Sequence, residues 1–343
     1  MKYENIFLVI IIVLLFTYIC YKFVSIRNQS CNNTLSKIMI TKPTLITNCN
    51  PAYRNYTINQ FCIKSSYNSA YTGSCMNIDT IPYLLTRGVR FLDFGVYGTI
   101  IPMVANSSDT SDEESLYLQD IFNIILQNAF NSSSSPNPED PLFIHLRIYA
   151  CDDKICNTIG DIIHNTFGIK LYTDGDGENK KAIPVNNYTK LSAIMGNVII
   201  VVNCTCTDSS KCNNLAKYIN IHSNTNDLIS DTYSNILKQQ IQSTTFDSKD
   251  TNKCMNGDTE LILKMAVPDM TDLPLDLKTL YLLIQSYGVQ IILCSFYNHV
   301  TLELYEDIFE RGHSAFTLLS RNIRYIKNNP PPTEPSLISG IST

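Results

Sequence analysis

The stretch "NVIIVVN", Asn197–Asn203, places β-branched residues next to one another without a polar break. A continuous run of this kind predicts a strand that is buried on both faces, as in a parallel sheet covered by helices. Similar runs recur on both sides of it: "FCIKSS" (61–66), "VRFLDFG" (89–95), "TIIPMV" (99–104), "LFIHLRI" (142–148), "KYINIHS" (217–223), "LILKMAV" (261–267) and "VQIILCSF" (289–296).

Segments with apolar residues at helical spacing lie between these runs. The clearest are "SLYLQDIFNIILQNAF" (115–130), "ICNTIGDIIHNTFG" (155–168) and "LDLKTLYLLIQSYG" (275–288), which closes on a glycine. Alternation of strands and helices predicts an α/β fold. Roughly eight strands over residues 59–326 fit a (β/α)8 TIM-type barrel, which takes about 250 residues.

Composition limits the partners. Apolar residues make up 44% of the chain and charged residues 17%, and the net charge is -5 without a Lys/Arg-rich run. Neutralising phosphates needs clustered positive charge, so a nucleic-acid partner is not expected.

The N-terminus carries a long apolar segment, "IFLVIIIVLLFTYICYKFV", at residues 6–24. A helix of this length spans about 28 Å, close to the roughly 30 Å of a bilayer's hydrocarbon core. A cleaved signal peptide is the alternative, but its apolar region is usually about 7–15 residues and ends in small residues. We therefore expect an uncleaved, single-pass transmembrane helix, with a membrane as partner.

Sequons and cysteines favour a lumenal or exterior domain, whereas the Lys/Arg count around the apolar segment does not decide the orientation. Asn-x-Ser/Thr sequons begin at Asn28, Asn32, Asn55, Asn106, Asn131, Asn187 and Asn203. Of the 12 cysteines, only Cys20 lies in the apolar segment. Such a density suits an oxidising compartment with disulfides. Cys151–Cys156 and a pair among Cys204, Cys206 and Cys212 are the local candidates; a zinc site is the alternative, but paired Cys-x-x-Cys motifs are absent from the sequence.

The predicted organisation follows from these features: an N-terminal flank (1–5), the transmembrane anchor (6–24), a polar stalk (25–58), the barrel (59–326) with a polar insert (224–260), and a flexible Pro-rich tail (327–343).

The stretch "IKSSYNSAYTG" (63–73), followed by "IPYLLTRGVRFLDFGVYG" (81–98), resembles the start of the catalytic X region of phosphoinositide-specific phospholipase C. Later segments of the chain also resemble segments of this family, and they follow one another in the same order as in the family. The resemblance divides the barrel into an X-like part at 59–203 and a Y-like part at 215–326. The resemblance implies a PLC-like phosphodiesterase barrel. It also implies chemistry in which one His stabilises the phosphate, another protonates the leaving group, and calcium held by Asn and three carboxylates activates the attacking hydroxyl.

Most of that chemistry is replaced at the equivalent positions. The first His falls on Tyr67, whose phenol has an ordinary pKa of about 10 and cannot supply a protonated imidazole near neutrality. The second should lie in residues 99–108, yet the chain has no His before His145. Of the calcium ligands the resemblance implies, Asn68 and Asp93 are kept, whereas Gly95 and Arg147 replace carboxylates. No cofactor is therefore expected, because the calcium ligand set is incomplete.

Alternation along the strand "LFIHLRI" places His145 and Arg147 on one face, facing Asp93 of the neighbouring strand. We predict that Arg147 pairs with Asp93 and fills the vacated metal site. The candidate binding residues are Asn68, Asp93, His145, Arg147 and Lys264, the last being the remaining cation of the family's substrate-binding set.

Three interpretations of this mouth stay open at the level of sequence. It can be a relic at the barrel rim, a redesigned pocket in which Arg147 and Lys264 bind an anionic lipid headgroup, or a site of residual catalysis through Tyr67 and His145. We expect a catalytically inactive pseudoenzyme that serves headgroup binding, attachment or structure. The alternative is an active phosphoric diester hydrolase acting on phosphatidylinositol lipids.

The source of the protein and the membrane in which it lies are also expectations from sequence. An Asn- and Ile-rich, anchored chain without accessory domains is typical of a large DNA virus. That origin would place it in a virion or host membrane, with another membrane or virion protein as a further partner.

Overall fold

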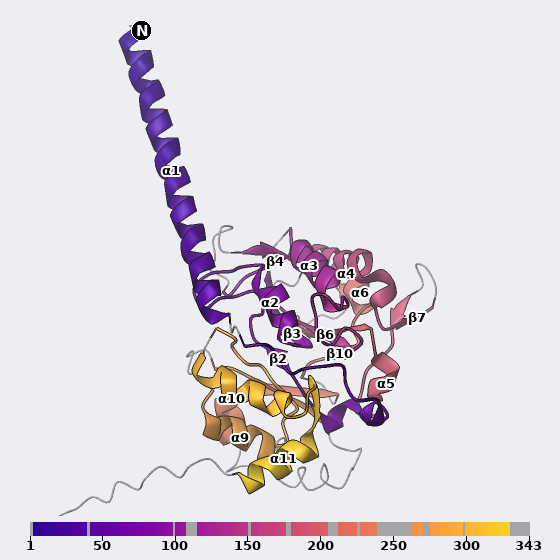
Figure 1. Cartoon of the computed structure of the whole chain (residues 1–343). Coiled ribbons are helices and arrows are strands. Elements are labelled where there is room, and N and C mark those ends of the chain that lie inside the picture. Colours follow the sequence, from indigo (N-terminus) through magenta and orange to yellow (C-terminus); the bar gives the residue numbers. More distant parts are fainter. Residues whose placement is uncertain are drawn as a thin grey trace, which may run out of the picture.

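The structure is a computed structural model, and it describes residues 3–39, 42–98, 100–107, 115–149, 152–175, 180–204, 212–224, 227–238, 262–269, 275–297 and 299–329. Its core is a closed barrel of parallel strands with helices on the outside (Figure 1). We call each strand position of the barrel wall a stave, and β1 and β2 together form the first one. In chain order the staves are β1 and β2 (Phe61–Ile63 and Ser65–Ser66), β3 (Phe91–Tyr97), β6 (Leu142–Ile148), β9 (Val198–Cys204), β10 (Ile221–His222), β11 (Leu228–Thr232), β12 (Leu263–Val267) and β13 (Ile291–Ile292).

Neighbouring staves pair in parallel around the whole circle. The Ser223–Leu228 bridge joins β10 to β11, and the pairing of Ile63 with Ile291 joins β13 back to β1. The α/β barrel prediction is confirmed. Apart from the 99–104 run, each run predicted as a strand contributes to a stave, because continuous β-branched sequence suits strands that are covered on both faces.

The helices are α2 (Thr80–Thr86), α3 (Leu118–Ala129), α4 (Asp153–Phe167), α5 (Leu191–Ile194), α6 (Asn213–Ala216), α7 (Tyr233–Lys238), α9 (Leu277–Gln285), α10 (His299–Glu310) and α11 (Leu319–Asn328). The three helices predicted from spacing are α3, α4 and α9. In α4 the Asp152 side chain accepts hydrogen bonds from the backbone N–H groups of Lys154 and Ile155, and the helix ends at Gly168, whose φ of 41° suits a residue without Cβ.

Short elements among the described residues include η1 (Pro51–Tyr53), η2 (Ile58–Gln60), η4 (Gly168–Lys170), and the pair β7 (Thr173–Asp174) and β8 (Lys181–Ala182).

Two strand predictions differ from the structure. The run at 99–104 is not a stave: it supplies β4 (Met103–Val104), which pairs antiparallel with β3 and with β5 (Leu116–Tyr117) at the end of the barrel where β3 finishes. The missing stave is β11, inside the predicted polar insert 224–260. Only Leu228 of β11 is buried, so its sequence, "LISDT", lacks the apolar run that marks the other staves.

The chain begins with a long helix, α1 (Tyr3–Ile38), which contains the predicted anchor and continues into the predicted stalk. Among the residues given above, no helix is both long enough and apolar enough to cross a membrane. Part of the remaining stalk segment packs on the barrel: Ile46 and Cys49 are buried in the core, and the Cys49 N–H donates to Asp140 Oδ1 at 2.8 Å. A last strand, β14 (Phe316–Leu318), adds antiparallel to β1.

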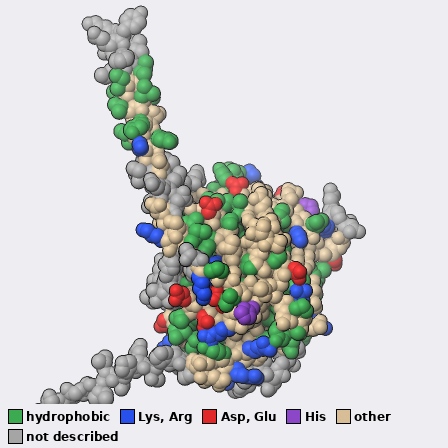
Figure 2. Space-filling view, viewed as in Figure 1, with side chains coloured by type: hydrophobic (Ala, Val, Ile, Leu, Met, Phe, Trp, Pro, Cys, Tyr) green, Lys and Arg blue, Asp and Glu red, His purple; other side chains and the backbone are tan. Residues whose placement is uncertain are grey.

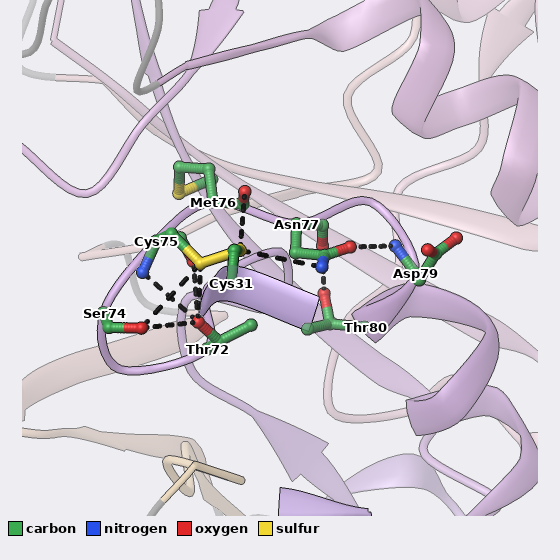
Figure 3. Close-up of a disulfide and its surroundings, with 8 residues drawn as sticks. All are labelled: Cys31, Thr72, Ser74, Cys75, Met76, Asn77, Asp79 and Thr80. Atoms are coloured by element: carbon green, nitrogen blue, oxygen red, sulfur yellow. Dashed lines mark hydrogen bonds between the residues drawn. A yellow bond between two sulfur atoms is a disulfide. The ribbon is translucent and has the colours of Figure 1, made fainter. Parts of the chain in front are cut away.

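Disulfides join parts far apart in sequence. Cys31 of α1 bonds Cys75 in the segment after β2 (Figure 3). Cys156 bonds Cys212, so the predicted Cys151–Cys156 pair is wrong, and Cys212 pairs outside its predicted trio. The cause is tertiary: a Cβ at Gly160 would lie 2.9 Å from the Leu215 backbone nitrogen, so this glycine lets α4 and α6 approach closely. Cys204 is also disulfide-bonded, whereas Cys151 and Cys206 lie outside the described residues.

Candidate functional site

The candidate site extends from the middle to the carboxyl ends of β3 and β6, which are adjacent staves. In the parallel register of these two strands, Asp93 of β3 is paired with His145 of β6, and Gly95 is paired with Arg147. Tyr67 and Asn68 follow β2, the other neighbour of β3. Parallel strands bring their carboxyl ends to one edge, which explains why residues distant in sequence meet at this mouth.

The predicted ion pair between Arg147 and Asp93 is present, and it is bidentate. Arg147 Nε donates to Asp93 Oδ1 at 2.9 Å, and Arg147 Nη2 donates to Oδ2 at 3.0 Å. The Asp93 side chain is fully buried and that of Arg147 is 12% exposed. The planar guanidinium matches both carboxylate oxygens at once, which an ammonium could not do.

Asp93 has two further partners. His145 Nδ1 lies 2.8 Å from Oδ1, and the Asn68 backbone N–H donates to Oδ2 at 3.0 Å. Burial on its own would raise the pKa of Asp93, but the Arg147 guanidinium and these hydrogen bonds together hold that pKa below its usual range. Asp93 is therefore an ionised carboxylate whose two oxygens are both engaged within the protein.

Arg147 is enclosed by polar and aromatic groups. Nη1 donates to the Tyr149 hydroxyl at 3.0 Å and to the Tyr67 hydroxyl at 3.4 Å, and Nη2 also donates to Asn68 Oδ1. The guanidinium carbon lies 4.8 Å from the centroid of the Tyr67 ring. Burial disfavours the charged guanidinium, yet Asp93 raises the pKa of Arg147 above its usual value. Tyr67 thus covers the ion pair, and burial raises the pKa of its own phenol, so it stays neutral.

A side chain at position 95, where the resemblance implies a carboxylate, would crowd its neighbours. A Cβ there would lie 3.0 Å from the Ala105 carbonyl oxygen and 3.2 Å from the Tyr97 ring. The Tyr97 and Tyr149 rings stack at a centroid distance of 4.7 Å above this point. Sequence reasoning missed these two tyrosines, although they lie two residues beyond Gly95 and Arg147 and so share the same strand faces.

His145 is fully buried. Its Nδ1 contacts Asp93, its ring lies 5.9 Å from the Phe91 ring, and its Nε2 has no hydrogen-bond partner in the described part of the chain. This geometry is that of a core residue that orients Asp93.

Lys264 does not join the other candidate residues. It is fully buried, and its Nζ donates to the Tyr287 carbonyl at 3.1 Å. Tyr287 precedes β13, so the ammonium lies toward the amino ends of the strands, away from Arg147. An internal lysine of this kind takes the nearest acceptors, which sequence spacing does not reveal.

The residues present do not fit a calcium ion. Calcium takes six to eight oxygen ligands, and carboxylates supply most of the charge. Here the guanidinium of Arg147 binds both oxygens of Asp93, and within the described ranges no group of three or more His, Cys, Asp or Glu side chains could hold a metal. A fixed positive charge at this point would repel a divalent cation.

A small cavity lies beside Tyr67 and Asn68, between them and side chains such as Tyr83 and Phe296. It measures about 10 Å³, which is at the lower limit for one water molecule. Arg147 and Asp93 do not line it.

The segment that follows Asn68 is fixed from outside the barrel. Figure 3 shows Cys75 bonded to Cys31 of α1, with the Thr72 hydroxyl donating to the Cys75 carbonyl at 3.0 Å. The Asn77 backbone N–H donates to the Ala70 carbonyl at 2.8 Å, which closes the turn. The C-terminal end of α1 is thereby attached to the mouth end of the molecule.

The structure is a closed parallel α/β barrel with a polar cluster toward the carboxyl ends of its strands. Residues 54–203 match the family model of the phosphatidylinositol-specific phospholipase C X domain. A search by sequence of curated proteins finds no match to this chain.

Two solved structures are similar in fold. L. pealei PLC21 has a TM-score of 0.59 at 14% identity over 79% of this chain, and S. officinalis PLC21 has a TM-score of 0.62 at 14% identity over 83% of it. The chain spans 39% of the length of each of these proteins. At this identity the similarity establishes the fold alone.

Proposed function

We propose that this chain is a catalytically inactive phosphatidylinositol phospholipase C-like protein that acts as a membrane-attached binding or structural domain. The observation that carries the proposal is the bidentate Arg147–Asp93 pair, at the position where the resemblance to the family implies a metal ligand. Tyr67, at the position where the resemblance implies an imidazole, is packed on that pair.

The rim of the mouth supports membrane attachment. Exposed apolar side chains gather there from the β3–β5 region and from the end of β6: Ile100, Ile101, Tyr117 and Tyr149. Exposed apolar residues also cover α1 from Ile10 to Tyr21 (Figure 2). Because Cys31 ties α1 to the mouth, both apolar surfaces lie toward the same end of the molecule. We propose that this end faces a membrane, where the tyrosine hydroxyls of the rim contact anionic headgroups.

Compartment and origin follow from the same proposal. The Cys31–Cys75 and Cys156–Cys212 disulfides support a domain on the lumenal or exterior side. A viral source, and a second membrane or virion protein as partner, stay predictions from sequence.

The test of inactivity is hydrolysis. Purified full-length protein is incubated with phosphatidylinositol vesicles with and without calcium, beside an active phospholipase C. We expect no inositol phosphate above the buffer level. Turnover that is lost in Tyr67→Phe or His145→Ala would overturn the proposal and favour an active diester hydrolase.

The test of attachment is vesicle flotation. We expect the full chain to float with vesicles that contain phosphatidylinositol, and the double variant Ile100→Asp/Ile101→Asp to float several-fold less. The matched control is Ile169→Asp, which changes an exposed isoleucine in η4, at the other end of the barrel. Equal flotation of both variants and the wild type would refute a role for the rim.

A further inference from the structure

A second pocket, unrelated to the mouth, lies at the opposite end of the barrel. It measures about 150 Å³ and is lined by residues of η1, the end of α10, β14 and α11. The pairing of Phe61 with Leu318 places it at the amino end of β1. Figure 1 shows α11 at the end of the molecule away from α1. Its floor is apolar and includes Ile308, Phe316 and Ile326, all of which are buried.

The rim of this pocket is cationic. Arg311 and Arg321 line it, and none of the described lining residues is Asp or Glu. Each guanidinium rests on a tyrosine: Arg311 lies 3.6 Å from the centroid of Tyr325, and Arg321 lies 4.7 Å from that of Tyr53. Stacking on a ring holds a guanidinium in place while its N–H edge stays open to a ligand.

The two arginines differ in their remaining partners. Arg311 also pairs with Asp307 of its own helix, which offsets part of its charge. Arg321 makes no ion pair or hydrogen bond with another described residue, so its charge is the one that a ligand can neutralise.

We propose that this pocket binds a small soluble anion with an apolar body, such as an aryl or short-chain phosphate or carboxylate. A cavity of about 150 Å³ lined by apolar groups can hold a benzene ring. The guanidiniums at its rim would bind the phosphate or carboxylate through paired N–H groups. Charge complementarity therefore selects an anion, and volume limits its apolar part to one ring or a few methylenes. The inference does not depend on the proposed function of the mouth.

The experiment is a calorimetric titration of full-length protein in detergent with phenyl phosphate as probe, compared with phenol and with inorganic phosphate. We expect saturable binding of phenyl phosphate at one site, and weaker binding of each half alone. Arg321→Gln should lower the affinity at least fivefold, and Arg311→Gln should lower it less because Asp307 already pairs with that arginine. The matched control, Arg324→Gln, changes an exposed arginine of α11 that does not line the pocket, and it should leave the affinity within twofold.

Several outcomes would overturn the inference. One is the absence of saturable binding, and another is an equal loss in Arg321→Gln and Arg324→Gln, which would indicate a diffuse basic surface. Loss of binding in Tyr149→Phe would assign the probe to the mouth. Binding of vesicles that contain phosphatidic acid, without binding of soluble phenyl phosphate, would assign the site to a lipid. Circular dichroism of each variant separates lost binding from lost folding.

Discussion

At the level of single residues, Arg147 makes Asp93 one partner of a buried ion pair. A buried ion pair costs desolvation on both sides, so its presence alone is weak evidence of stabilisation. The pair does fix the charge state of the mouth. Both carboxylate oxygens of Asp93 accept hydrogen bonds, and displacing the Arg147 guanidinium would leave this buried carboxylate without a counter-charge.

Removing one partner of this pair should be costly. We predict that Arg147→Met lowers the free energy of unfolding by about 3–5 kcal/mol, because Asp93 is left charged and buried. The double variant Arg147→Met/Asp93→Asn should recover most of that loss. Urea denaturation measures both, with the exposed Arg324→Met as a control that changes stability by less than about 0.5 kcal/mol. A loss below about 1 kcal/mol for Arg147→Met would contradict the buried pair.

Gly95 tests whether the mouth has room for the missing carboxylate. A Cβ would meet the Ala105 backbone carbonyl, which is not free to rotate away. We predict that Gly95→Ala destabilises the protein by about 1–3 kcal/mol, as overpacking does, and that Gly95→Asp does not create calcium binding. Thermal unfolding and calorimetry measure the two effects. If Gly95→Ala leaves the thermal stability unchanged, the residues around position 95, including Tyr97 and Tyr149, can move to accommodate a Cβ.

Asp140 gives a pH dependence whose sign is opposite to that of Asp93. Burial raises the pKa of Asp140 to about 6, although the hydrogen bond from the Cys49 N–H opposes this. The folded state therefore holds this proton more tightly than the unfolded chain, so the contribution to stability is full below pH about 4 and is lost as the pH rises to about 6. Because the pKa of Asp140 lies roughly 2 pH units above its ordinary value, the free energy of unfolding should fall by about 3 kcal/mol over this range.

The measurement for Asp140 is urea denaturation from pH 4 to 7. We expect Asp140→Asn to flatten the decline between about pH 4 and pH 6. An unchanged slope in the variant would show that other groups cause the decline. For Asp93, whose pKa is lowered, the contribution is present above about pH 4 and is lost as the pH falls.

At the level of helices and strands, sequence patterns predict the elements that are well covered by the rest of the protein. β9 begins with five consecutive apolar residues, and β6 is apolar except at His145 and Arg147, because both faces of these strands are covered. α4 has an acidic cap at one end and is followed by a glycine at the other. β11 escapes detection because its side chains are only partly buried. The 99–104 run is apolar for a different reason, since Ile100 and Ile101 lie exposed at the rim.

The Cys31–Cys75 disulfide is the element-scale link between α1 and the mouth. We predict that Cys31→Ser/Cys75→Ser lowers the free energy of unfolding by about 4 kcal/mol, from the entropy of the loop it closes. Amide hydrogen exchange should rise in residues 71–77 and in the C-terminal part of α1. The control is Cys20→Ser, which changes an exposed free cysteine of the same helix. Unchanged exchange in residues 71–77 would mean that the mouth segment holds its position without the disulfide.

For the whole molecule, sequence predicts the barrel and the meeting of Asn68, Asp93, His145 and Arg147, but not the tyrosines that close this cluster. The Asp93–Arg147 pair follows from alternation on adjacent strands. The direction of Lys264, the tyrosine stack over Gly95 and the Cys156–Cys212 bond depend on tertiary packing, and single-strand patterns carry no information about it. The pocket beside α11 is likewise built from four separate elements.

We propose that the Arg147 guanidinium has taken the place that the resemblance gives to a calcium ion. A calorimetric titration of the full-length protein with calcium, up to about 10 mM, reaches ten times the weakest range of protein calcium sites. We predict no binding at the mouth, and no difference between the wild type and Asp93→Asn. Stoichiometric calcium binding that disappears in Asp93→Asn would show that the mouth still holds the ion and would refute the proposal.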